Sequence, residues 1–309
     1  MTGRTDLPVN AGAQPRPAQL ASADAVLNAG LSAAANATVN VTESTAHESP
    51  TTRARLRARS MIIWFLRSPI ASVIAVALLW QCVTVAFKVS PRVIPPLSVV
   101  LADAWHIRLD LATSFGRTLL ETVLGFVGGS LLGCLFGITF AYVRTLERAV
   151  FPLFVISQSM PVVAFGALVV IWFGNTLLAK VMMALFLSFL PVTVNTLRGL
   201  KSIDPQRIGL MRSFGAKGYT LFARLAWPWA LPQIIVGLKV AISLSLIGSI
   251  VGEWFGETVG LGVMLLQAMY TEDMTRLWTV IVACGLMGSA LYGLISLIER
   301  RLVWWRSEA

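Results

Sequence analysis

Six residues interrupt the long apolar stretches of this sequence or stand at their ends. They are Gln158, Met160, Pro161, Asn195, Glu253 and Trp254. Polar groups at membrane depth are costly, and a proline leaves backbone groups unpaired that can line a cavity, so such residues are candidates for a solute pathway. An interhelical hydrogen bond explains Gln158 or Asn195 equally well, and both interpretations stay open.

Other chemistry has little support in the sequence. The three cysteines, Cys82, Cys134 and Cys284, lie inside apolar runs, and His47 and His106 are isolated. No pair of residues has the spacing of a metal site or of a nucleophile with its base, and no phosphate-binding loop G-x-x-x-x-G-K-[ST] occurs. We therefore expect no catalytic residue, no bound metal and no cofactor, and a membrane-embedded enzyme is the least supported function.

The composition is that of a membrane protein. Hydrophobic residues make up 56% of the 309 residues and charged residues only 13%, about half of what a soluble surface requires. The net charge of +10 is carried by residues that flank apolar stretches and form no single basic face. We interpret these charges as determinants of membrane topology, and we expect no nucleic-acid partner.

The apolar stretches predict an all-α, polytopic protein with about six transmembrane helices. The predicted spans are 70–87, 119–142, 151–173, 177–197, 233–255 and 277–298. Residues 1–60 are rich in Ala, Thr, Ser, Asn and Pro, which predicts a disordered cytoplasmic tail. The transmembrane domain would then occupy residues 61–309.

The distribution of Lys and Arg predicts the orientation. With the N-terminus inside, sixteen of these residues fall on the inner side, in the segments 53–67, 144–148, 198–224 and 300–306. Only six fall outside: Lys88, Arg92, Arg108, Arg117, Lys180 and Arg276. Positive residues accumulate on the cytoplasmic side of membrane proteins, so both termini are predicted to be cytoplasmic.

Glycines recur every fourth residue in the second predicted span, at Gly125, Gly129, Gly133 and Gly137. Small residues at this spacing let two helices approach closely, either within the chain or at a dimer seam. Lys239 is predicted to reach toward the inner surface, and Arg117 to pair with Glu121 as a structural i,i+4 contact.

The longest inner connection, residues 198–232, carries signals for structure of its own. Asp204 is a good N-cap and Pro205 suits a first helical position, so a short helix is predicted up to Gly215. A second helix is predicted from Lys217 to Trp227, ended by Pro228. Its apolar and basic face would suit either a partner protein or lipid headgroups.

This loop resembles the EAA loop of binding-protein-dependent ABC importer permeases. Gly215 matches the glycine of that motif, and Leu225-Ala226-Trp227-Pro228 stands where Ile-x-Leu-Pro is expected. Further segments, among them Ile171-Trp172-Phe173-Gly174 and Gly252-Glu253-Trp254-Phe255-Gly256, resemble the nitrate/sulfonate/taurine-type branch. The Glu-Ala-Ala triplet itself is replaced by Gly209, Leu210 and Met211, which leaves open how this chain makes the polar contacts of the missing glutamate.

The resemblance implies a MetI-like importer-permease fold in a bacterial inner (plasma) membrane. It implies a second permease copy, in a homodimer, two ABC ATPase subunits that bind the ATP, and a periplasmic or extracytoplasmic solute-binding protein. The coupling residues that it implies are Asp204, Pro205, Arg207, Arg212, Ser213, Phe214, Gly215, Ala216, Leu225 and Pro228. The transported solute would be nitrate, a sulfonate, taurine or a related small molecule. An ion-coupled secondary transporter or a channel remains the alternative.

Overall fold

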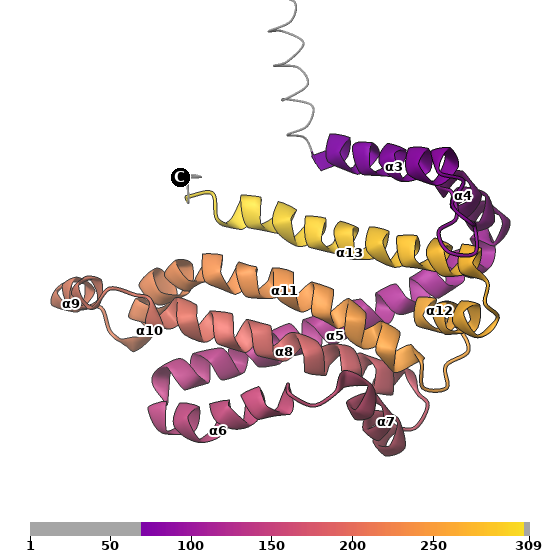
Figure 1. Cartoon of the computed structure of the whole chain (residues 1–309). Helices are drawn as coiled ribbons and strands as arrows, with labels where there is room; N and C mark the ends of the chain where they lie inside the picture. Colours follow the sequence, from indigo (N-terminus) through magenta and orange to yellow (C-terminus); the bar gives the residue numbers. More distant parts are fainter. Residues whose placement is uncertain (1–68, 306–309) are drawn as a thin grey trace, which may run out of the picture. The chain divides into compact units, whose positions relative to one another are not determined.

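The computed structural model describes residues 69–305, and every regular element in that range is a helix. The chain divides into two units, Met1–Val76 and Ala77–Ala309. The predicted N-terminal tail, residues 1–60, lies outside the described residues. The helices, shown in Figure 1, are α3 (Pro69–Ala86), α4 (Leu97–His106), α5 (Arg108–Tyr142), α6 (Arg144–Ser157), α7 (Val162–Phe173), α8 (Leu177–Lys201), α9 (Pro205–Ser213), α10 (Gly218–Leu221), the π-helical turn η1 (Phe222–Ala226), α11 (Trp227–Glu253), α12 (Leu261–Tyr270) and α13 (Met274–Leu302).

Four continuous helices are long and apolar enough to cross a membrane. They are α5, α8, the continuous stretch Gly218–Glu253 that contains α11, and α13. Each contains one of the predicted spans, apart from Trp254 and Phe255, which lie beyond the end of α11. The predicted span at 70–87 corresponds to α3, whose described apolar part, Ala71–Ala86, is shorter than a full crossing. The described residues therefore hold four helices long and apolar enough to span, or five if the bent pair is counted as one, and the predicted number of six is not confirmed.

The bent pair replaces the predicted single helix at 151–173. Helices α6 and α7 meet at 102° across a break of a few residues. Pro161 stands at the N-cap of α7 with ψ of 122°. Helix α6 does not continue through this position, because the proline offers no N–H and disfavours helical geometry in Met160 before it. The predicted span at 151–173 therefore contains a sharp break at the proline that was named as a helix-breaking residue.

The glycine series packs within the chain. Gly125, Gly129, Gly133 and Gly137 are buried in α5 and face Ala184, Ser188, Val192 and Thr196 of α8, in that order. Both series advance by four residues in the same direction, so α5 and α8 lie parallel and in close contact. Gly237 and Gly248 of α11 face Asn195 and Ala184 in the reverse order, so α11 is antiparallel to α8.

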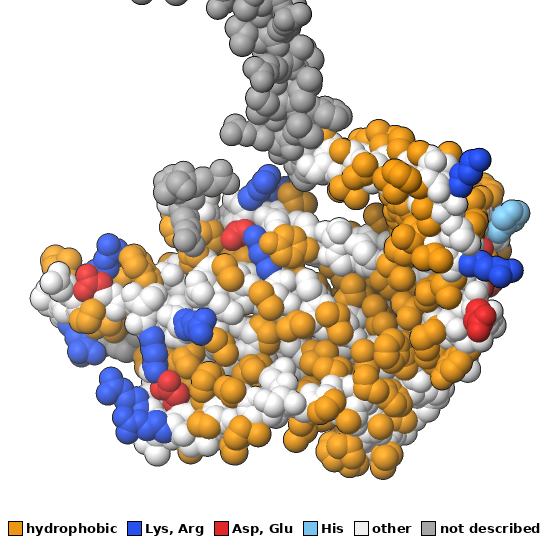
Figure 2. Space-filling view, in the orientation of Figure 1, with side chains coloured by type: hydrophobic (Ala, Val, Ile, Leu, Met, Phe, Trp, Pro, Cys, Tyr) orange, Lys and Arg blue, Asp and Glu red, His pale blue; other side chains and the backbone are white. Residues whose placement is uncertain are grey.

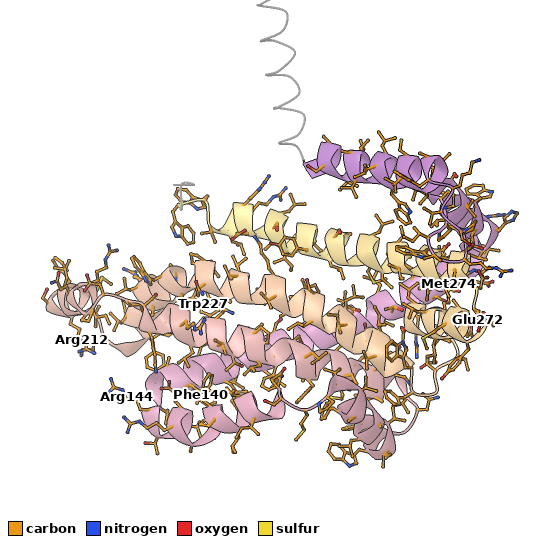
Figure 3. The ribbon with its side chains drawn as sticks, viewed as in Figure 1. Phe140, Arg144, Arg212, Trp227, Glu272 and Met274 are labelled. Atoms are coloured by element: carbon orange, nitrogen blue, oxygen red, sulfur yellow. The ribbon has the colours of Figure 1, made fainter. Side chains whose placement is uncertain are left out.

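These directions determine the path of the chain between α5 and α8. Two parallel neighbours require the intervening segment to return along their length, so α6 and α7 together make one crossing. Figure 3 shows the polarity of the bundle, with Arg144, Arg212 and Trp227 at one end and Glu272 and Met274 at the other. We call these the Arg212 end and the Glu253 end, since α11 finishes with Glu253 at the latter.

Candidate functional site

At the Arg212 end, a short helix and a glycine turn form as predicted. The Asp204 carboxylate accepts a hydrogen bond from the Gln206 N–H at 2.9 Å, and Pro205 opens α9. The helix ends at Ser213, whose hydroxyl donates to the Leu210 carbonyl at 2.7 Å. Gly215 then adopts a left-handed backbone with φ of 80°, a conformation that favours glycine. The turn closes where Ala216 N–H donates to the Met211 carbonyl.

The second helix predicted in this loop, from Lys217 to Trp227, does not end where expected. No break occurs at Pro228, and one helical stretch runs from Gly218 to Glu253. The turn before this proline is the π-helix η1, in which the Trp227 N–H bonds to the Phe222 carbonyl five residues back. Widening the helix there accommodates the proline ring and its missing N–H, so Leu225 and Pro228 lie within a continuous helix.

Three large apolar side chains at the tip of this loop are mostly exposed and are not covered by other described residues. Leu210, Phe214 and Tyr219 are 59%, 80% and 84% exposed. Arg212 and Lys217 are exposed beside them. A cluster of exposed apolar side chains is unfavourable in water, so three such groups framed by cations form a surface suited to binding another protein. We call this surface the loop tip.

The base of the loop is held to the bundle. Phe222 packs against Tyr142 and Trp227, with ring centroids 6.3 and 6.0 Å apart. The Arg207 guanidinium stacks over the Trp229 ring at 4.4 Å. These contacts join the base of the loop to the beginning of α11 and to the end of α5.

At the Glu253 end, ionisable side chains from three helices meet in the interior. Glu121 of α5, Lys180 of α8 and Glu253 of α11 are all almost completely buried. The Glu253 carboxylate accepts from the Gly262 N–H at 2.5 Å, and its other oxygen lies 2.6 Å from the Thr118 hydroxyl. Glu253 thereby joins α11 both to α5 and to the beginning of α12.

Two cations pair with two of the three carboxylates that meet here, Glu121 and Glu257. Arg117 lies 3.0 Å from Glu121, the predicted i,i+4 pair, and 3.7 Å from Glu257. Lys180 lies 3.1 Å from Glu257 and also donates to Asn175. Burial by itself raises the pKa of Glu257, but the hydrogen bonds from Lys180 and Thr258 and the charges of Lys180 and Arg117 hold that pKa below its ordinary value. We call Arg117, Thr118, Glu121, Lys180, Glu253 and Glu257 the Glu253 cluster.

Loss of the Lys180 charge should destabilise the bundle strongly. Lys180→Met would leave the Glu257 carboxylate without its nearest cation in a mostly buried position, at a cost of about 3 kcal/mol. The matched control is Lys239→Met, because Lys239 also pairs with a carboxylate, Glu299, at 2.5 Å but is partly exposed. Its cost should be about 1 kcal/mol. Thermal unfolding of the two purified variants checks this order, and equal Tm values would contradict it.

The candidate pathway residues fall in separate places. Gln158 ends α6 and donates to the Phe186 carbonyl at 3.1 Å, so its amide does make an interhelical hydrogen bond. Met160 and Pro161 are exposed in the break between α6 and α7. Asn195 accepts from Gln233 at 2.9 Å, nearer the Arg212 end. The structure brings none of these four residues together with the Glu253 cluster.

Trp254, the last candidate, follows Glu253 and packs against the buried residues Val169, Ala179, Met183 and Val251. Lys239, predicted to reach toward the inner surface, forms an ion pair with Glu299 near the C-terminal end of α13. Sequence reasoning assigned Glu121 only to a local pair and counted Lys180 as an outer charge. The common burial of Glu121, Lys180 and Glu253 was not predicted, because each of them lies 59 or more positions from the next in the sequence. The only indication of this burial in the sequence was that all three lie in apolar helices.

Comparison with known proteins agrees with this architecture. Residues 111–304 match the family described as binding-protein-dependent transport system inner membrane component. The formylaminopyrimidine transport permease ThiX of Halalkalibacterium halodurans is 35% identical over 71% of this chain and 88% of its own length. The aliphatic sulfonates transport permease SsuC of Bacillus subtilis, named as putative in its description, is 25% identical over 74% of this chain and 84% of its own.

A solved structure has the same fold. The inward-facing MetNI methionine ABC transporter contains a chain that aligns with a TM-score of 0.57 at 19% identity. The alignment covers 63% of the present chain and 97% of that chain. The MetI-like fold predicted from the sequence is thereby confirmed.

Proposed function

The chain belongs to the binding-protein-dependent transport system inner membrane components, and from this premise we propose that it carries a small organic solute or anion inward through an ABC importer. Its role as a membrane permease of this transporter class follows from the family. The solute class rests on the relatives, whose printed names include formylaminopyrimidine, riboflavin and aliphatic sulfonates. The proposed location is a bacterial inner membrane.

The observation that carries the proposal is the loop tip. Exposed Leu210, Phe214 and Tyr219 beside Arg212 and Lys217 form a docking surface for an ATPase subunit. The arginines and Lys217 would supply polar contacts in place of the family's missing glutamate. Since the sequence has no phosphate loop, ATP would be hydrolysed by two partner subunits.

The orientation follows from the same assignment. The Arg212 end carries most of the Lys and Arg residues and would face the cytoplasm, together with both termini. The Glu253 end would face the solute-binding protein. A second copy of this chain, in a homodimer, would complete the pathway.

In this arrangement the Glu253 cluster keeps the pathway closed at its outer end. Glu253 ties α11 to α5 and to the beginning of α12, so separating α11 from these two helices requires Glu253 to leave Thr118 and Gly262. The break around Gln158, Met160 and Pro161 would line the pathway, because an interrupted helix presents backbone groups to a polar solute. Asn195 would lie at its inner part.

Measurements of ATP hydrolysis test whether a separate subunit, and not this chain, hydrolyses the ATP. The purified chain alone should hydrolyse no ATP, because nothing in it can hold the phosphates. The chain together with the importer's ATPase subunit should form a complex that hydrolyses ATP. The rate of hydrolysis by this complex should increase when the solute-binding protein is added. Hydrolysis by a contaminant-free preparation of the chain alone would contradict the proposal.

A further inference from the structure

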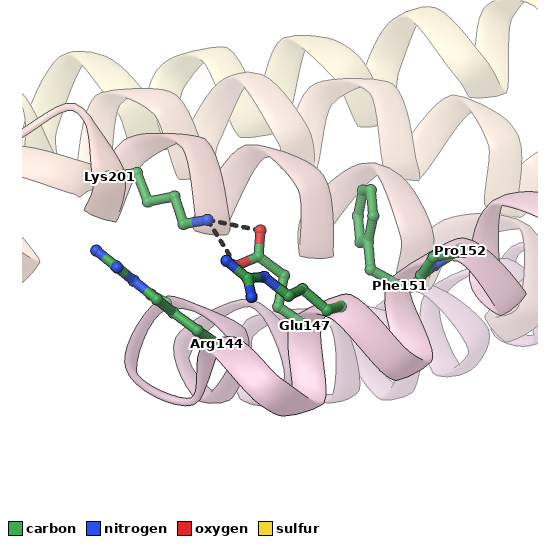
Figure 4. Close-up of a pocket in the computed structure, with 7 residues that line it drawn as sticks. Arg144, Glu147, Phe151, Pro152 and Lys201 are labelled. Atoms are coloured by element: carbon green, nitrogen blue, oxygen red, sulfur yellow. Dashed lines mark hydrogen bonds and ion pairs between the residues drawn. The ribbon is translucent and has the colours of Figure 1, made fainter.

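A basic crevice lies at the Arg212 end, between α6 and α8, away from the loop tip. It encloses about 720 Å³ and is lined by Ala141, Arg144, Glu147, Arg148, Phe151, Pro152 and Lys201. Figure 4 shows Arg144, Glu147, Phe151 and Pro152 on α6 and Lys201 on α8, with Lys201 directed toward Glu147. A neighbouring hollow of about 430 Å³ shares Glu147, Phe151 and Lys201 and adds Arg198. Four cations therefore surround one carboxylate.

Most of this positive charge has no counterpart within the described chain. Lys201 holds both oxygens of Glu147, at 2.5 and 2.6 Å. For Arg144, Arg148 and Arg198 no ion pair with a carboxylate occurs among residues 69–305. Glu147 also fixes Lys201 beside the two arginines of α6. The crevice and the neighbouring hollow together thus keep a net charge of about +3, which suits an anion with several acceptor oxygens.

The surface next to the cations is apolar. Phe151 and Pro152 form one wall, and further along α6 Leu153, Val155 and Ile156 are 61%, 47% and 61% exposed. Figure 2 shows blue Lys and Arg side chains gathered at this end and orange hydrophobic side chains over the neighbouring surface. Because α6 and α7 together are apolar enough to cross a membrane, the apolar side of α6 would lie at the depth of the acyl chains.

We propose that this crevice binds the phosphate headgroup of an anionic phospholipid. Arg144 and Arg148 stand one turn apart on α6, so both guanidinium groups can donate to one phosphodiester, with Arg198 closing the site from α8. The acyl chains would lie along Leu153 and Ile156. Basic pockets between helices at the cytoplasmic surface are typical sites for such headgroups. The inference needs the membrane orientation but not the transport cycle.

Bound lipid can be counted directly on the full-length protein. Native mass spectrometry of the detergent-purified chain, titrated with phosphatidylglycerol, should show one lipid retained more tightly than phosphatidylcholine. Arg144→Gln with Arg148→Gln should weaken that binding about 30-fold, which corresponds to about 1 kcal/mol for each cation removed. The matched control, Arg300→Gln with Arg301→Gln, removes two exposed cations at the end of α13, outside the crevice, and should leave the affinity unchanged.

Four results would overturn the proposal. Equal weakening by the control pair would show only general attraction to the basic end. Equal retention of phosphatidylcholine would show that the headgroup charge is not recognised. Displacement of the lipid by inorganic phosphate at micromolar concentration would assign the site to a free anion. Unchanged lipid binding combined with loss of ATPase co-purification from the crevice variant would assign these arginines to a protein interface.

Discussion

Gly215→Val should abolish transport while leaving the bundle intact. Gly215 has φ of 80°, a region in which a β-branched residue is a genuine outlier, although no neighbour would touch an added Cβ. The cost therefore falls on the turn between α9 and α10, which must reorient and displace the loop tip. Phe214 and Tyr219, on either side of the turn, would no longer share one surface. We expect near-normal membrane levels, poor ATPase co-purification and uptake reduced at least 100-fold.

Gly215→Asn is the matched control at the same position. Asparagine visits the left-handed region readily, and the space around Gly215 is open, so this variant should keep most of its uptake. Uptake and co-purification measured together on both variants distinguish backbone strain from side-chain size. Normal uptake by the valine variant with the ATPase still bound would show that this loop is only a surface helix pair.

Gly133→Leu should destabilise the bundle more than any loop substitution. A Cβ at Gly133 would stand 2.6 Å from the Phe189 carbonyl oxygen and 2.7 Å from the Val192 Cβ, so α5 and α8 would have to separate along their contact. Overpacking of this kind costs about 3 kcal/mol, or a fall in Tm of roughly 5–10 °C. The measurement is thermal unfolding of the detergent-purified protein.

Gly116→Leu serves as the control on the same helix. Gly116 is exposed, and nothing lies within 4 Å of its added Cβ. This variant should unfold within about 1 °C of the wild type. A Gly133 variant as stable as the Gly116 variant would mean that α5 and α8 do not approach as closely as described.

Apolar length and local capping signals were sufficient to predict much of the fold. They located α5, α8, α11 and α13 because a membrane span requires a minimum run of apolar residues. Asp204 and Pro205 likewise predicted the beginning of α9, since N-cap chemistry is local. The four-residue glycine spacing predicted close packing, but only the partner series on α8 distinguishes intrachain packing from a dimer seam.

Two prolines in apolar helical segments have opposite outcomes. Pro161 interrupts its span, as expected of a helix-breaking residue, whereas Pro228 was expected to end a helix and is instead absorbed by a π-helical turn. The ring removes the same N–H in both cases. Whether the chain breaks or widens depends on what packs around the freed carbonyls, which local sequence does not report.

The Glu253 cluster required the three-dimensional structure. Glu121, Lys180 and Glu253 lie on three different helices. For each residue taken alone, the sequence indicates only a local ion pair for Glu121, a charge flanking a span for Lys180 and a residue at a helix end for Glu253. Their common burial depends on the register of α5 and α8 against α11. That register is determined by the packed glycines rather than by the charged residues themselves.

The energy source for uptake tests the central claim most directly. Proteoliposomes would hold this chain with its ATPase and solute-binding protein, and the probe would be whichever of taurine, an alkanesulfonate or formylaminopyrimidine the binding protein retains. We predict uptake that requires ATP on the side of the loop tip, persists when ionophores collapse all ion gradients, and is lost in Gly215→Val. Uptake without ATP, driven by an imposed proton or sodium gradient, would contradict the account and assign the chain to the secondary transporters.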